Sequence, residues 1–239
     1  MPNDTEVIIQ LKEAYLDILS KTDFSKIYAS PGLSGIFLAC PDKSYFEAKR
    51  KVLFIGQEPK TWRTNCPIKN GAEVTQQLIQ QAMSQTVHQS KLPSGKHKLL
   101  NFYHKCSLAL SEGQPEIGCS AVYSNQFCMS LQRRSPERSP AFKMIEELSN
   151  SLLEAQFTIL KPDIAIFTTG SNRDKYIKNA LNYSTVEVVV PRKLWHFQVN
   201  ETHCFRINHP SARQSRKLEL SDYQDGAIER AKLYVPIRY

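Results

Sequence analysis

The chain has 239 residues, of which 41% are hydrophobic and 23% are charged, and these proportions are ordinary for a globular protein. No apolar stretch approaches the roughly 20 residues of a membrane-spanning helix, which argues against such a helix in this chain. Lysine and arginine total 31 against 23 aspartate and glutamate residues, and the formal charge of +8 favours an anionic partner, of which nucleic acid is the commonest.

Hydrophobic periodicity and loop-forming residues predict alternating helices and strands along most of the chain. The first helix places apolar residues at helical spacing from Val7 to Leu19. A later, longer helix opens after Ser139, with Pro140 at its first turn. The expected helices are 7–19, 72–83, 96–110, 141–160, 172–181 and 222–234, and the expected strands are 51–55, 120–127, 163–169, 186–190 and 204–207.

This alternation is typical of a mainly parallel sheet covered by helices on both faces. The apolar runs are short and continuous, as in strands that are buried on both sides. Neither an internal repeat nor a flexible linker interrupts the pattern. The sequence therefore predicts an α/β fold.

The six cysteines stand at positions 40, 66, 106, 119, 128 and 204, and no pair has the two-residue gap of a zinc or iron–sulfur site. We expect free thiols in a reducing compartment and no bound metal. The N-terminus, Met1 to Glu6, is acidic and polar, unlike a secretory signal. These features predict a cytoplasmic protein.

Two polar segments directly follow apolar runs of strand character. Val52–Ile55 leads into Gly56-Gln57-Glu58-Pro59, and Cys204–Ile207 leads into Asn208-His209-Pro210-Ser211. Ligands of open α/β sheets bind beyond the carboxyl ends of the strands. A carboxylate at one strand end and an imidazole at another are therefore a candidate active site.

Three side chains at strand ends carry the relevant chemistry. A carboxylate held rigidly at Glu58 can orient water or stabilise a positive charge, and its alternative is a solvated loop glutamate. His209, held before a proline, can donate a hydrogen bond or act as an acid or base, unless it is only a structural histidine. The carboxamide of Asn125 suits the edge of a nucleobase, and its alternative is a turn residue.

The motifs resemble those of the uracil-DNA glycosylase superfamily. Gly56-Gln57-Glu58-Pro59 is similar to the first motif of that family, and Asn208-His209-Pro210-Ser211 resembles the second. Tyr123-Ser124-Asn125 looks like the segment whose asparagine reads the base. The run from Leu160 to Asp163, before an apolar strand and Gly170, resembles the central region, and the likeness covers residues 51–216.

The resemblance implies a single three-layer α/β/α domain over residues 46–239, with a central, mainly parallel four-stranded sheet. Residues 1–45 match no part of the family pattern, and we expect them to form a helical segment packed on that domain. The implied activity is hydrolysis of the N-glycosidic bond that holds uracil or a related deaminated base in DNA, as in base excision repair. It requires no cofactor, and the expected partner of the monomer is single- or double-stranded DNA that contains the damaged base.

The resemblance also assigns roles to residues. Glu58 would position water and stabilise the sugar cation, and His209 would donate a hydrogen bond to the departing base. Gln57 and Asn125 would contact that base, and Trp62 is the candidate aromatic residue for stacking on it. The residues expected to hold DNA phosphates are Ser211, Arg213, Ser215, Arg216 and Lys217, and Arg213 resembles the residue of the single-strand-selective branch that fills the gap left by the flipped base.

Departures from the family pattern leave two alternatives open. Glu58 replaces an aspartate, Lys60 stands where a tyrosine would block the methyl group of thymine, and Ala212 replaces a proline. One alternative is a non-catalytic relative that binds nucleic acid or a partner protein. The other is an unrelated α/β hydrolase acting on a nucleotide or nucleoside, although the chain has neither a Walker loop nor a Gly-x-Ser-x-Gly elbow.

Overall fold

The structure is a computed structural model that describes residues 4–60, 73–93, 95–110, 120–212 and 218–237. Internal contacts divide the chain into two compact units, each built from three stretches of sequence. The first unit contains Met1–Cys40, Gln57–Gln89 and Ser124–Leu160, and the second contains Pro41–Gly56, Ser90–Tyr123 and Lys161–Tyr239. The boundary expected between residues 45 and 46 stays a prediction.

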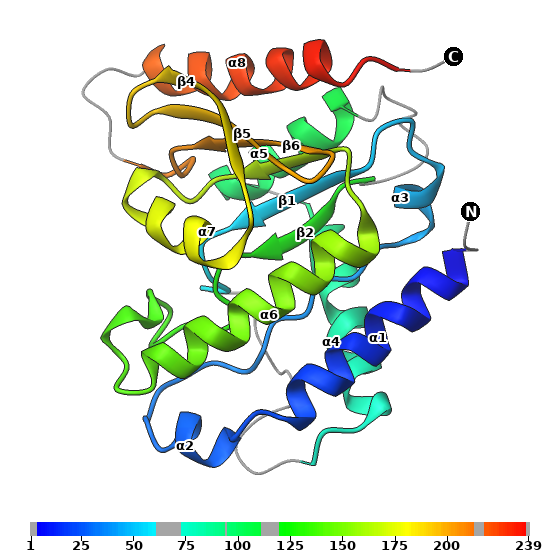
Figure 1. The fold of residues 1–239 in the computed structure, drawn as a ribbon, viewed down its shortest axis with the longest axis vertical. Helices are drawn as coiled ribbons and strands as arrows, with labels where there is room; N and C mark the ends of the chain where they lie inside the picture. The colour runs from blue at the N-terminus through cyan, green and yellow to red at the C-terminus, as the bar shows by residue number, and fades with distance from the viewer. Residues whose placement is uncertain (1–3, 61–72, 94, 111–119, 213–217, 238–239) are drawn as a thin grey trace. The chain divides into compact units, whose positions relative to one another are not determined.

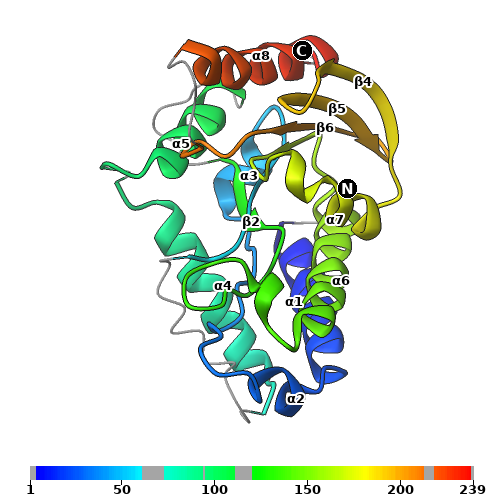
Figure 2. The same cartoon turned by 90° about the vertical axis from the view of Figure 1, so that its left-hand side faces the viewer.

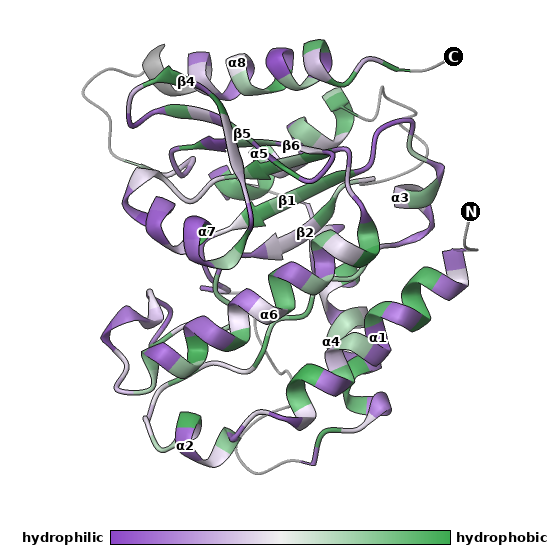
Figure 3. Ribbon diagram, viewed as in Figure 1, coloured by the Kyte–Doolittle hydropathy of each residue, from purple (hydrophilic) through white to green (hydrophobic). Residues whose placement is uncertain are grey.

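Helices dominate the first unit. Helix α1 buries Val7, Leu11, Tyr15 and Leu19, which recur every four residues and form one stripe of the helix, and it packs against α6. Figure 3 shows the corresponding alternation of apolar and polar positions along α1. The helices are α1 (Asp4–Ser20), α2 (Phe24–Tyr28), α4 (Gln76–Ser90), α6 (Phe142–Leu160) and the 3₁₀ turn η2 (Pro136–Arg138).

The three predicted helices of this unit are present with shifted ends, and α1 begins three residues before the predicted start and ends one residue after the predicted end. Helix α6 begins one residue after the predicted start and ends at the predicted residue, Leu160. Helix α4 begins four residues after the predicted start and continues to Ser90 instead of ending at Met83. Its later turns contain glutamine, serine and threonine, so hydrophobic periodicity alone did not mark their helical state.

A six-stranded sheet with the order β2-β1-β3-β6-β5-β4 forms the centre of the second unit, and the last two residues of β2 belong to the first (Figure 1). The strands are β1 (Val52–Gly56), β2 (Val122–Asn125), β3 (Ile164–Phe167), β4 (Ser184–Val190), β5 (Leu194–Val199) and β6 (Thr202–Ile207). The helices of this unit are α3 (Lys43–Glu47), α5 (Lys98–Leu110), η3 (Ser171–Arg173), α7 (Asp174–Ala180) and α8 (Leu218–Tyr234).

The α/β class is confirmed, but the expectation of four strands is wrong for the sheet as a whole. Strands β1, β3 and β6 are parallel, whereas β5 pairs antiparallel with both β6 and β4. The predicted strand at 186–190 is present as β4, and β5 was not predicted. Two short turns build this antiparallel part, and each contains a non-glycine residue with positive φ, Arg192 at 62° and Asn200 at 51°.

Helices cover both faces of the sheet in the second unit. Residues paired in register share a face of the sheet, so Phe54 and His196 lie on the same face. Phe54 contacts Phe102 of α5, and His196 contacts Tyr234 of α8, so both helices cover this face. Figure 2 shows α8 running along β5 and β6. Arg206 points to the opposite face, where α7 packs.

Candidate functional site

A tight turn after β1 holds Glu58. The Lys60 N–H donates to the Glu58 carbonyl at 2.9 Å, which closes the turn around Pro59. The Ser130 hydroxyl donates to the Pro59 carbonyl at 3.3 Å and anchors the turn to the first unit. The Glu58 side chain is only 1% exposed, and the Lys60 ammonium lies 3.5 Å from its Oε1. The turn therefore keeps a buried carboxylate next to one cation.

Asn125 ends β2 in the same unit, and its side chain is unusual. The residue is 6% exposed, and neither its Oδ1 nor its Nδ2 has a hydrogen-bond partner among the described residues. Buried polar groups are nearly always paired, so an orphaned carboxamide needs an explanation. A ligand with one donor and one acceptor side by side would satisfy both atoms.

One backbone hydrogen bond links the Glu58 and Asn125 segments. The Phe127 N–H donates to the Gln57 carbonyl at 2.9 Å, two residues beyond Asn125 and one residue before Glu58. The preceding side chain is also fixed, because the Ser124 hydroxyl donates to Gln156 Oε1 at 2.6 Å. This bond holds the segment of Glu58 and the half-buried Gln57 beside the segment of Asn125 within the first unit.

His209 belongs to the second unit, in the turn after β6. The Ala212 N–H donates to the His209 carbonyl at 2.7 Å, and Pro210 occupies the second position of this turn, where proline is favoured. The Ser211 N–H donates to His209 Nδ1 at 3.1 Å. This bond assigns Nδ1 as an acceptor, so the neutral imidazole carries its proton on Nε2. In this tautomer Nε2–H is the hydrogen-bond donor of the ring.

Gly170 supports the His209 turn from the end of β3. Its φ of 75° is unfavourable for residues with a side chain, and its N–H donates to the Ile207 carbonyl at 3.0 Å. A Cβ at this position would lie 3.7 Å from Asn208 Oδ1. Because that distance is an ordinary van der Waals contact, the positive φ and not a lack of space is what requires glycine at this position.

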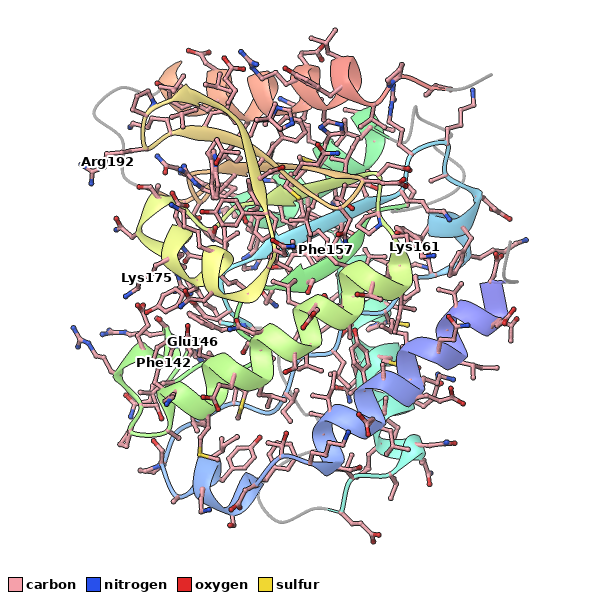
Figure 4. The ribbon with its side chains drawn as sticks, viewed as in Figure 1. Phe142, Glu146, Phe157, Lys161, Lys175 and Arg192 are labelled. Carbon is pink, nitrogen blue, oxygen red and sulfur yellow. The ribbon has the colours of Figure 1, made fainter. Side chains whose placement is uncertain are left out.

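The predicted site residues that the structure describes fall in both units. Gln57, Glu58 and Asn125 lie together in the first unit, whereas His209 and the exposed Ser211 lie in the second. Trp62, Arg213, Ser215, Arg216 and Lys217 lie outside the described residues. Two exposed cations of the second unit, Lys175 on α7 and Arg192 in the β4–β5 turn, extend away from the ribbon (Figure 4).

Sequence reasoning missed a buried ion pair on the α7 face of the sheet. Arg206, only 3% exposed, donates from one guanidinium nitrogen to Asp174 Oδ2 at 2.8 Å, and its Nε lies 2.7 Å from Oδ1. Burial raises the pKa of Asp174, and the Arg206 charge opposes this shift. The pair ties the start of α7 to the last residues of β6. An arginine inside a predicted apolar strand was the available signal.

The described residues contain no group of three or more histidine, cysteine, aspartate or glutamate side chains that could hold a metal ion. Cys40, Cys106, Cys128 and Cys204 are free thiols, and burial raises the pKa of Cys106 and of Cys204. Across the described parts of the chain, no helix is long and apolar enough to cross a lipid bilayer.

Comparison with known proteins does not assign this chain to a family. Neither a family model nor a curated protein matches the sequence of this chain.

Proposed function

We propose that this protein is a DNA glycosylase that hydrolyses the N-glycosidic bond of uracil or a related deaminated base. The observation that carries the proposal is the buried carboxamide of Asn125, which has no hydrogen-bond partner among the described residues and lies near Glu58. The edge of a pyrimidine such as uracil offers an imide N–H next to a carbonyl oxygen. These two groups pair with Oδ1 and Nδ2 of one asparagine side chain.

Glu58 carries the chemistry at the sugar. As the base departs, the sugar becomes an oxocarbenium-like cation, which a nearby carboxylate stabilises. The same carboxylate accepts a hydrogen bond from the water that attacks C1′ and so orients it. A side chain that is 1% exposed makes both interactions in a low-dielectric setting, where they are strongest.

His209 acts on the leaving base. The base departs as an anion, and Nε2–H donates a hydrogen bond to its developing oxyanion; a contribution of this kind is often worth about 3–4 kcal/mol. The Ser211 N–H sets the tautomer that makes this donation possible, because it occupies Nδ1. Ser211 therefore acts by positioning the ring, in addition to its expected contact with phosphate.

The remaining features complete the proposal. The target base is flipped out of the stack before its bond is hydrolysed, and Gln57 and Trp62 contact it. Ser211, Arg213, Ser215, Arg216 and Lys217 hold the phosphates of single- or double-stranded DNA. The protein has a uracil-DNA glycosylase-like fold. It acts in the cytoplasm as a monomer and without a cofactor.

The direct test is base release from oligonucleotides that contain uracil, hypoxanthine or xanthine, detected by strand cleavage after alkali. We expect release of at least one of these bases, and a loss of roughly 100-fold or more in Glu58→Gln and in His209→Ala. The exposed residues Glu13 and His88 offer matched controls, and Glu13→Gln and His88→Ala keep full activity.

The double variant Glu58→Gln/His209→Ala sharpens the test. Residues that act in one transition state have non-additive effects, so the double variant loses much less than the product of the two single losses. Strictly multiplicative losses, or no release of any of the three bases by the native protein, contradict the proposal.

The Lys60–Glu58 ion pair supports a second candidate, a non-catalytic protein that binds nucleic acid or a partner protein. A cation that neutralises Glu58 competes with the role of this carboxylate at the sugar. Salt-sensitive DNA binding with no base release would favour this candidate. Turnover that depends on Glu58 would eliminate it.

A further inference from the structure

Lys60 places an amine at the solvent side of the buried Glu58 carboxylate. Its Nζ lies 3.5 Å from Glu58 Oε1, and its backbone N–H closes the turn on the Glu58 carbonyl. The Lys60 side chain is 45% exposed, whereas that of Glu58 is 1% exposed. A molecule that reaches the carboxylate from solvent therefore meets the amine as well.

A lysine attacks a carbonyl carbon only as the unprotonated amine, so a Schiff-base lysine needs a group within reach that accepts the proton of its ammonium. Glu58 is such an acceptor. The proposed function supplies the carbonyl compound, since loss of a base leaves a deoxyribose whose ring opens to an aldehyde at C1′. The reactive product would thus form next to a lysine able to capture it.

We propose that Lys60 is the nucleophile of a second activity of this protein, a lyase that cleaves the DNA strand at an abasic site. The inference rests on the proposed function, which places the sugar next to Glu58. It goes beyond that function, because base hydrolysis needs no amine and leaves the strand intact.

The first stage joins the protein to the sugar. The Lys60 ammonium gives one proton to the Glu58 carboxylate, and the free amine adds to C1′ of the aldehyde. The proton returns from Glu58 to the new hydroxyl group, which leaves as water. The products are an iminium ion on Lys60 and one water molecule.

The second stage breaks the strand. Glu58 removes a proton from C2′, and the electron pair of that C–H bond expels the 3′-phosphate as the C3′–O bond breaks. Water then hydrolyses the unsaturated iminium ion, which restores the Lys60 ammonium and releases an unsaturated aldehyde. Glu58 loses its proton to solvent, so no oxidant or reductant is needed.

A second ion pair of the protein serves as a matched control. The Lys91 side chain is 50% exposed and lies 2.6 Å from Asp42, whose side chain is 17% exposed. Asp42 caps α3 by accepting a hydrogen bond from the Ser44 N–H at 3.0 Å. Lys91 therefore has a similar exposure and a carboxylate partner, but its partner has a structural role.

The experiment uses the full chain and a labelled oligonucleotide with a preformed abasic site, so it does not depend on base release. Borohydride reduces the iminium ion to a stable covalent adduct, which a denaturing gel detects, and mass spectrometry of the digested adduct identifies the modified lysine. We expect an adduct at Lys60 and strand cleavage without alkali. Lys60→Arg lowers both by about 20-fold or more, because a guanidinium does not form the iminium ion, and Lys91→Arg changes neither.

The outcomes separate this inference from the proposed function. Absence of an adduct with native protein, or an adduct mapped to another lysine, overturns the role of Lys60, whether or not Lys60→Arg folds. Release of uracil without an adduct overturns the lyase alone. An adduct at Lys60 without release of any base overturns the glycosylase and leaves the lyase standing.

Discussion

At the scale of single residues, a buried carboxamide without a partner weakens a folded protein, because its hydrogen bonds to water are lost and not replaced. The cost of such a group is about 1–3 kcal/mol. Asn125 is in this position, and apolar side chains of similar size exist that would avoid the cost. In the proposed function, the flipped base pairs with this amide and accounts for a polar side chain at the end of β2.

Asn125→Leu therefore has opposite expected effects on stability and activity. Leucine has the same branching and the same number of side-chain heavy atoms but no polar atoms, so we expect the free energy of unfolding to rise by about 1 kcal/mol, while base release is lost. Urea denaturation and the oligonucleotide assay measure the two effects.

Gln156 offers the matched control for this substitution. It is also a buried amide, 3% exposed, but its Oε1 accepts the Ser124 hydroxyl. Gln156→Leu leaves that hydroxyl unpaired and lowers the free energy of unfolding. A destabilised Asn125→Leu variant would show that the amide has a structural partner in the protein.

The sequence makes Glu58, Asn125 and His209 candidates because each stands at or just after the end of a recognisable apolar strand. It did not predict that Lys60 pairs with Glu58, that Asn125 is unpaired, or that Ser211 sets the His209 tautomer. These properties depend on the course of the backbone within a turn, which residue types alone leave open.

At the scale of elements, α8 packs over a pair of histidines on the sheet. His196 on β5 is fully buried, and its Nε2 lies 3.0 Å from Nδ1 of His203. The centroid of its ring lies 4.4 Å from the ring centroid of Tyr234 on α8. Burial, with a smaller effect of His203, lowers the pKa of His196 from 6.5 to about 4. Burial also lowers the pKa of His203.

The lowered pKa of His196 predicts a loss of stability in mild acid. Between pH 6.5 and 4 the unfolded chain binds a proton at His196 that the folded protein excludes, so the free energy of unfolding decreases as the pH falls. The expected contribution is about 2 kcal/mol between pH 7 and pH 5. Urea denaturation at several pH values measures it.

His196→Phe keeps a ring for stacking on Phe205 and removes the titration. The variant should lose less stability than the native protein over the same pH interval. His88→Gln on the surface of α4 is the control and keeps the native dependence. Equal pH dependence in native protein and His196→Phe would show that other groups facing the pair, such as His203, Glu187 and Arg230, carry the acid response.

The same region shows why one element escaped sequence analysis. Strand β5 has the sequence Leu194-Trp195-His196-Phe197-Gln198-Val199. Polar residues stand at only two of its alternate positions, between large apolar residues. His196 and Trp195 face opposite sides of the sheet, yet both are buried because α8 covers one face and α7 packs against the other. Period-two patterning disappears when both faces are covered, whereas the parallel strands β1 and β3 remained recognisable as continuous apolar runs.

At the scale of the whole molecule, composition and alternation were enough to predict the α/β class, but not the antiparallel part of the sheet. Connections through helices produce parallel neighbours, and the sequence shows several of these. The chain also changes direction twice in short turns, at Arg192 and Asn200, where non-glycine residues adopt positive φ. Neither residue type marks such a turn as strongly as glycine does, so the two reversals were not evident.

The net charge of +8 predicts salt-dependent binding to DNA. Binding that neutralises about four phosphates lowers the association constant roughly 100-fold between 50 and 200 mM salt, because condensed counterions are released. Fluorescence anisotropy of a labelled oligonucleotide measures this dependence, and the Glu58→Gln variant prevents turnover during titration.

Two double variants with equal loss of charge locate the contacts. If Arg213 and Arg216 bind phosphates, the variant Arg213→Ser/Arg216→Ser lowers the slope of log K against log[salt] by about 2. Lys175→Ser/Arg192→Ser removes two exposed cations of the second unit and leaves the slope unchanged. Equal reductions in both variants would mean that the total charge of the protein, and not the segment after His209, determines its attraction to DNA.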